Sequence, residues 1–105
     1  MKKTQIDTVK INSKEFDTLL EVEYLLSELQ DLLEEKNKAY GDSALNPIRL
    51  FSKISAAESL RIRIDDKLSR IKNKGITPDT EDSLMDLIGY LILLKIAIKK
   101  EKRAY

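Results

Sequence analysis

Residues 84–98 restrict the possible folds of this chain most, because apolar side chains occupy nearly every side of the helix that they would form. A helix that is apolar all round must be covered all round by other parts of a protein. Three further helices in a chain of 105 residues can hardly provide that cover. We therefore expect this helix to lie at a subunit interface and the protein to be a homo-oligomer.

The rest of the chain also shows helical periodicity. Across residues 15–39 apolar side chains recur three and four positions apart, at Leu19, Val22, Leu26, Leu29 and Leu33. Residues 58–72 form a second amphipathic stretch, with an inward set of Ala57, Leu60, Ile64, Leu68 and Ile71. These patterns predict an all-α, oligomeric bundle of three to four main helices.

Capping signals divide these helices. They are an N-cap at Ser13, an N-cap and first-turn proline at Asn46-Pro47, a capping box from Ser55 to Glu58, a stop at Asn73-Lys74-Gly75 and a second N-cap and proline at Thr77-Pro78. The signal at Asn46 predicts a short helix over residues 48–54, and that at Ser55 either starts a new helix or marks a bend. We expect residues 1–13 to form an N-terminal arm, with a short strand at most, and residues 14–105 to form a single helical domain.

The composition excludes several kinds of chemistry. Charged residues make up 35% of the chain at a net charge of +1, so the basic surplus needed for non-specific nucleic-acid binding is missing. The chain has no cysteine and no histidine, which excludes disulfides, thiolate nucleophiles and the usual general base and zinc ligands. Carboxylates would have to hold any metal, which favours magnesium or manganese. No signal segment or membrane-spanning run is present, so we expect a cytoplasmic protein without membrane contact.

Carboxylates gather at two places. Glu28, Asp31 and Glu35 are spaced three and four positions apart on the first helix, and they form either a solvated acidic face or a set that converges on a cation. Asp82 and Asp86 lie one turn apart at the start of an otherwise apolar helix. Because two carboxylates are costly to bury unpaired, a functional role is favoured for this pair.

Basic and aromatic residues form two further candidate sites. Arg63, Lys67 and Arg70 share one face of a helix, as a salt-bridged solvent face or as a clamp for three phosphoryl groups. Residues 36–43 read as a helix C-cap in which Gly41 is left-handed, or as a ligand loop whose lysines meet phosphates while Tyr40 meets a base or sugar. The two interpretations are compatible, because a cap can be part of a site.

Four motifs occur in an order that suggests a known family. They are residues 36–43, residues 46–51, residues 63–70, and residues 81–82 with 86–90. Over about residues 20–98 the chain resembles the nucleotide-modification-associated domain family of phage and bacterial proteins, whose name implies a connection with nucleotides. More distantly, it is similar to the all-α nucleoside triphosphate pyrophosphohydrolases of the MazG and dimeric dUTPase kind. Those enzymes hold magnesium with an ExxE and a later ExxD motif, cleave between the α and β phosphates, and are usually dimers or tetramers.

The resemblance implies roles for individual residues. The ExxD motif maps onto Asp86 with Ser83 three positions before it, and the ExxE motif onto residues 28–31 or 31–34. Magnesium would be held by Glu28, Asp31, Asp82 and Asp86, and Glu35 would act as the base. The phosphates and the nucleoside would be bound by Lys36, Lys38, Tyr40, Arg49, Arg63, Lys67 and Arg70.

Three functions stay open at this point. The first is a magnesium-dependent nucleotide pyrophosphohydrolase. The second is a non-catalytic binder of a nucleotide or a cyclic nucleotide signal, which a phage could use in the host cytoplasm against host defence. The third is a helical interaction module in which every charged stripe is a solvated face. Ser83 in place of an acidic residue favours the binder over the enzyme, and the shared Tyr-Gly and Asp-Asp-Lys motifs favour both over the module.

Overall fold

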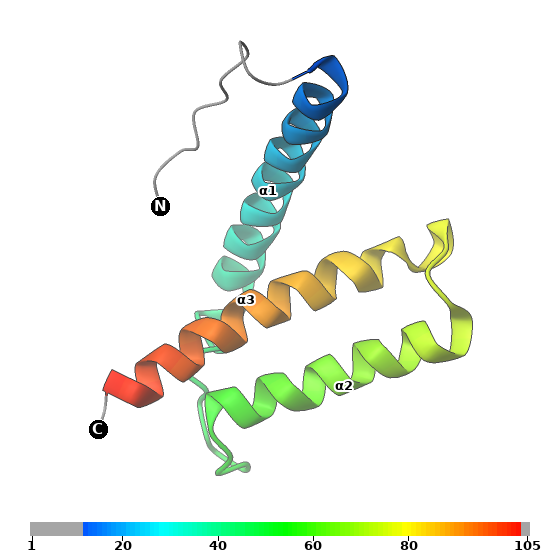
Figure 1. The fold of residues 1–105 in the computed structure, drawn as a ribbon. Helices are drawn as coiled ribbons and strands as arrows, with labels where there is room; N and C mark the ends of the chain where they lie inside the picture. Colours follow the sequence, from blue (N-terminus) through cyan, green and yellow to red (C-terminus); the bar gives the residue numbers. More distant parts are fainter. Residues whose placement is uncertain (1–11, 104–105) are drawn as a thin grey trace. The chain divides into compact units, whose positions relative to one another are not determined.

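The computed structural model describes residues 12–103, and this part of the chain is all-helical without a strand (Figure 1). Its elements are α1 (Ser13–Tyr40), α2 (Ala56–Lys74), the short 3-10 helix η1 (Pro78–Thr80) and α3 (Glu81–Arg103). The prediction of an all-α fold is confirmed, and of the three to four main helices expected, the described residues form three. The predicted N-terminal arm lies outside the described residues, apart from its last two positions.

Side-chain caps fix where the first two helices begin. The N–H of Glu15 donates to Asn12 Oδ1 at 2.9 Å, so Asn12 caps α1, and the expectation that Ser13 is the cap is wrong by one position. The hydroxyl of Ser55 accepts from the N–H of Glu58 at 3.1 Å. The predicted N-cap at Ser55 is confirmed, and it starts a new helix.

The end of α1 is a glycine cap, as one interpretation of residues 36–43 predicts. Gly41 has a φ of 60°, and the N–H of Asp42 donates to the carbonyl of Asn37 at 3.1 Å. This bond from the residue after the left-handed glycine to a carbonyl in the last turn is that of a Schellman motif. The cap therefore satisfies a helix carbonyl that would otherwise lack a partner.

The prediction of a short helix over residues 48–54 is wrong, because the structure has no helix between α1 and α2. Asn46 does not cap a following helix: its backbone N–H donates to the carbonyl of Asp42 at 3.0 Å and its side-chain amide donates to Asp42 Oδ2 at 2.6 Å. These bonds close a turn toward the preceding residues. Arg49 then takes a φ of 58°, which a right-handed helix does not permit.

The chain divides within α1 into two compact units, residues 1–32 and residues 33–105. In the second unit α2 and α3 lie side by side as an antiparallel pair, joined through Gly75 and η1 (Figure 1). Gly75, with a φ of 76°, ends α2 and donates its N–H to the carbonyl of Ile71 at 2.7 Å. The core of this unit is small and consists of Ala57, Leu60 and Ala97, with Ala44, Leu45, Tyr90, Leu93 and Leu94 packed against it.

Much of the predicted apolar surface is not covered within the single chain. In the first unit Leu29 is buried, whereas Val22 and Leu26 of the same stripe are exposed by 46% and 50%. On α3 the side chains of Ile88 and Leu91 are exposed by 38% and 48%. Between residues 12 and 103 no helix, α3 included, is long and apolar enough to cross a bilayer.

Candidate functional site

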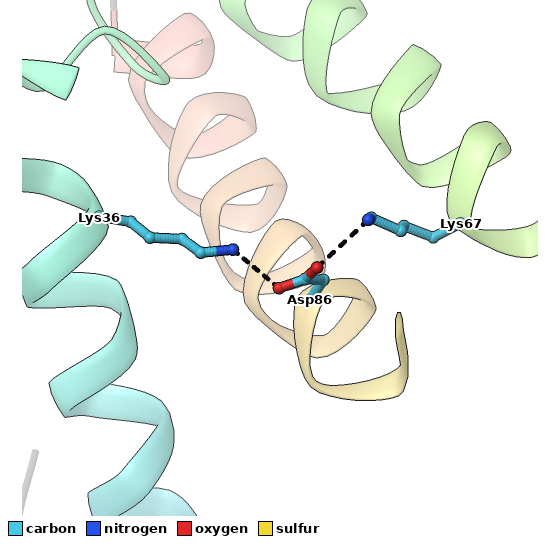
Figure 2. A network of polar contacts seen from close by, with 3 residues as sticks. All are labelled: Lys36, Lys67 and Asp86. Carbon is cyan, nitrogen blue, oxygen red and sulfur yellow. Dashed lines mark hydrogen bonds and ion pairs between the residues drawn. The ribbon is translucent and has the colours of Figure 1, made fainter. Parts of the chain in front are cut away.

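Asp86 of α3 contacts one lysine from each of the other two helices. Lys36 of α1 donates from Nζ to Asp86 Oδ1 at 2.8 Å, and Lys67 of α2 lies with its Nζ 3.2 Å from Asp86 Oδ2. Figure 2 shows the two lysines reaching the carboxylate of α3 from opposite sides. We refer to Lys36, Lys67 and Asp86 as the lysine–aspartate cluster.

The cluster is sheltered but not closed to water. The side chains of Lys67 and Asp86 are exposed by 19% and 20%, and that of Lys36 by 42%. Burial by itself would raise the pKa of Asp86, but hydrogen bonds from Lys36 and Lys67 outweigh it and hold the pKa below its ordinary value. The hydrogen bond to Asp86 raises the pKa of Lys36, against the effect of burial. Both pKa shifts favour the charged forms of Asp86 and Lys36, and two lysines with one aspartate give the cluster a formal net charge of +1.

The sequence brings these residues together because each one occupies an inward position of its helix. On α2 the buried side chains at residues 57, 60 and 64 follow a spacing of three and four, and the next position in that series is Lys67. On α1 the leucine stripe that passes through Leu29 and Leu33 continues to Lys36. On α3 Asp86 follows the buried Ser83 at a spacing of three. Three charged side chains thus stand where the pattern calls for apolar ones.

The position of Lys67 corrects one prediction about the core. Leu68 was expected to lie inside, but its side chain is exposed by 48%. The inward position between Ile64 and Ile71 is taken by Lys67, which turns Leu68 about 100° toward solvent. An inward lysine in a helix is the sequence signal that distinguishes Lys67 from the other basic residues of α2.

The other predicted phosphate ligands are exposed around the cluster or beyond it. Arg63 and Arg70 lie on α2 roughly 40° and 60° round from Lys67, and both are exposed and make no ion pair with a described residue. Lys38 is exposed in the last turn of α1, and Tyr40, the last residue of α1, is exposed by 70%. Arg49 is exposed in the connection between α1 and α2.

The predicted carboxylate ligands do not form a group in the described part of the chain. Glu28 and Asp31 are exposed in the first unit, whereas Glu35 and Asp82 are exposed in the second. Between residues 12 and 103 no three acidic side chains lie close enough together to hold a metal ion. Asp86 is the one predicted carboxylate ligand that enters the cluster, where each of its oxygens already has a lysine partner.

Tyr90 is a neighbour of the cluster that the sequence did not single out as a site residue. It lies one turn after Asp86 on α3 and packs against the core. Together with Tyr40 it contributes to the raised pKa of Lys36, after the larger effects of Asp86. The spacing of four from Asp86 is the signal that could have identified it.

The arrangement suits the binding of an anion. Each lysine ammonium has three hydrogen-bond donors, and the bonds shown use one of them on Asp86. The remaining donors can meet phosphoryl oxygens while Asp86 keeps both ammonium groups in place. No family model, curated protein or solved structure matches the chain, so the function has to be inferred from these residues.

Proposed function

We propose that this protein is a homo-oligomeric nucleotide-binding protein, of the nucleotide-modification-associated and MazG-like kind, that binds phosphate through Lys36 and Lys67. The observation that carries the proposal is the cluster itself, in which two ammonium groups from different helices converge on one half-buried carboxylate. If Asp86 served only to stabilise the fold, one lysine partner would be enough. The second lysine adds a positive charge that an anion can neutralise.

A nucleotide offers more to this surface than inorganic phosphate does. Arg63 and Arg70 lie on the same side of α2 as Lys67, and their forked guanidinium groups can each bind two phosphoryl oxygens. Tyr40 presents an exposed ring at the end of α1 on which a base can stack. The proposed ligand is therefore a compound with several phosphoryl groups and a base, such as a nucleoside triphosphate or a cyclic oligonucleotide.

The contacts of Asp86 favour binding without turnover. Both of its oxygens are engaged by ammonium groups, and a magnesium ion could use Asp86 only by displacing at least one lysine. The second candidate function is the magnesium-dependent pyrophosphohydrolase, which is favoured by Asp82 and Asp86 standing one helical turn apart. Within one chain, the described residues include no group of three acidic side chains that could hold the magnesium ion of such an enzyme.

Calorimetry with nucleoside triphosphates, with and without Mg²⁺, tests the proposal. Lys67→Ala should weaken binding by about 1–3 kcal/mol, the value of a charge-assisted hydrogen bond. Lys72→Ala is the matched control, because Lys72 is an exposed lysine on a different side of the same helix, and it should change affinity little.

Product analysis of the same mixtures separates the two functions. Tight binding without a monophosphate product supports the binder, and Asp86→Asn should then leave affinity unchanged or improve it, because a negative charge near the phosphates is removed. Release of pyrophosphate that Asp86→Asn abolishes would support the enzyme. Hydrolysis that survives Asp86→Asn would refute the site, and a wild-type protein that binds none of the nucleotides would refute both functions.

A further inference from the structure

The outward side of α3 is an apolar stripe with charged ends. At about 100° per residue its members lie within an arc of roughly 140°. We call it the outer stripe, and it comprises Glu81, Leu84, Met85, Ile88, Leu91, Ile92, Lys95, Ile96 and Lys99. Its four central aliphatic side chains are exposed: Ile88 by 38%, Leu91 by 48%, Ile92 by 37% and Ile96 by 37%. A stripe of this kind on a helix, apolar between its ends except for Lys95, marks a surface that another molecule covers.

The second unit uses the opposite side of α3 for its own packing. Ser83 and Ala97 are buried there, and Asp86 on the same side receives Lys36 and Lys67. Asp86 lies about 160° round the helix from Ile88. Helix α2 and Lys36 of α1 therefore contact the inner side of α3, and the outer stripe remains available for a partner.

The order of charges along the outer stripe is self-complementary. An acidic residue, Glu81, stands at its N-terminal end, the aliphatic residues follow, and Lys99 stands at its C-terminal end. If two copies cross antiparallel about a two-fold axis near residue 90, Ile88 faces Ile92, Leu84 faces Ile96, and Glu81 faces Lys99. A two-fold interface needs such a self-complementary surface.

The charges at the two ends of the stripe distinguish the two possible orientations of a dimer. Acidic residues in the first turn and basic residues near the end favour any helix, and in the antiparallel arrangement Lys95 would face Met85. A parallel arrangement of two copies would place Glu81 against Glu81 and Lys99 against Lys99. The charges therefore select the antiparallel arrangement.

We infer that the outer stripe of α3 binds the outer stripe of a second copy of this chain, antiparallel and about a two-fold axis near residue 90. This inference rests on the homo-oligomer of the proposed function and is independent of the nucleotide. It adds the surface, the orientation and the pairing of Glu81 with Lys99.

A charge reversal and its rescue test the pairing. Sedimentation velocity over a range of concentrations should show that Glu81→Lys and Lys99→Glu each weaken dimerisation by about tenfold, because each change turns two attractions into two repulsions. The double variant should recover most of the lost affinity. Lys100→Glu is the control, since Lys100 is an exposed lysine about 100° from Lys99, and it should have little effect. Double variants as weak as the single ones would overturn the pairing.

A single introduced cysteine tests the axis, because the chain has no cysteine of its own. Leu91→Cys should form a disulfide between two copies on mild oxidation, whereas Lys100→Cys should not. If the wild-type protein is a dimer but the Leu91→Cys variant forms no disulfide between copies, the proposed interface is wrong and the oligomer itself still stands. A protein that stays monomeric at every concentration would refute both, and nucleotide binding by that monomer would still support phosphate binding.

Discussion

Asp86→Asn should reduce the stability of the second unit, because Asp86 is the shared partner of two lysines. Where both groups are sheltered, a hydrogen bond to a charged group contributes about 1.5–3 kcal/mol. Lys36 is 42% exposed, so its bond contributes less, about 0.5–1 kcal/mol. Asparagine can accept from one ammonium group but turns its NH₂ toward the other. The expected loss is therefore about 1–2 kcal/mol, or roughly 5–10 °C in the melting temperature.

Urea unfolding followed by circular dichroism measures this loss, with Asp82→Asn as the matched control. Asp82 lies one turn earlier on α3 and is exposed, so its replacement should cost less than about 0.5 kcal/mol. A double-mutant cycle with Lys67→Met should return a coupling of about 1 kcal/mol or more between Lys67 and Asp86. Equal losses for the two asparagine variants, with no coupling, would refute the account of the cluster.

Four further predictions test the cluster and other parts of the structure. The pKa of Asp86 lies below its ordinary value of 3.8. The contribution of Asp86 to stability should therefore be complete above pH 3.8 and be lost as the pH falls through the lowered pKa. Urea unfolding over a pH series should show this loss of stability at acid pH in the wild type and not in Asp86→Asn. The pKa of Lys36 lies above 10.5, so its contribution should be present below that value and be lost as the pH rises through the raised pKa. Gly75→Ala should cost about 1–3 kcal/mol through backbone strain alone, because φ is 76° and nothing lies within 4 Å of an added Cβ; a melting temperature equal to that of the wild type would contradict this. Leu91→Lys should dissociate the proposed oligomer in sedimentation while the helical circular dichroism persists, since Leu91 is already exposed in the single chain.

The positions of the three helices and most of their caps could be predicted from the sequence. The periodicity of apolar residues placed α1, α2 and α3 close to their observed bounds, and the glycines at 41 and 75 ended two of them as expected. Ser55 capped α2 because its hydroxyl reaches the N–H of Glu58, an interaction within one turn. Features that depend on neighbouring residues along the chain were therefore accessible without a structure.

Predictions failed where two local patterns competed. Asn46-Pro47 satisfies the rule for a helix start, but Asn46 instead uses its backbone and side chain to close a turn on Asp42. On α2 both Lys67 and Leu68 fit a helical spacing between Ile64 and Ile71, and the hydrophobicity of Leu68 suggested that it lies inside. In the structure Lys67 takes the inward position and Leu68 is exposed.

The cluster itself could have been predicted only in part, because its meaning depends on long-range contacts. The sequence identified Asp86 as costly to bury unpaired, but the partners that satisfy it come from residues 50 positions earlier and 19 positions earlier, Lys36 and Lys67. The acidic stripe of α1 suggested that Asp86 would meet other carboxylates and a cation. In the structure Asp86 contacts two ammonium groups, those of Lys36 and Lys67, and the sequence did not indicate these partners. Two ammonium groups carry one positive charge more than Asp86 can neutralise, so the contacts that hold the cluster together also support the proposal that it attracts phosphate.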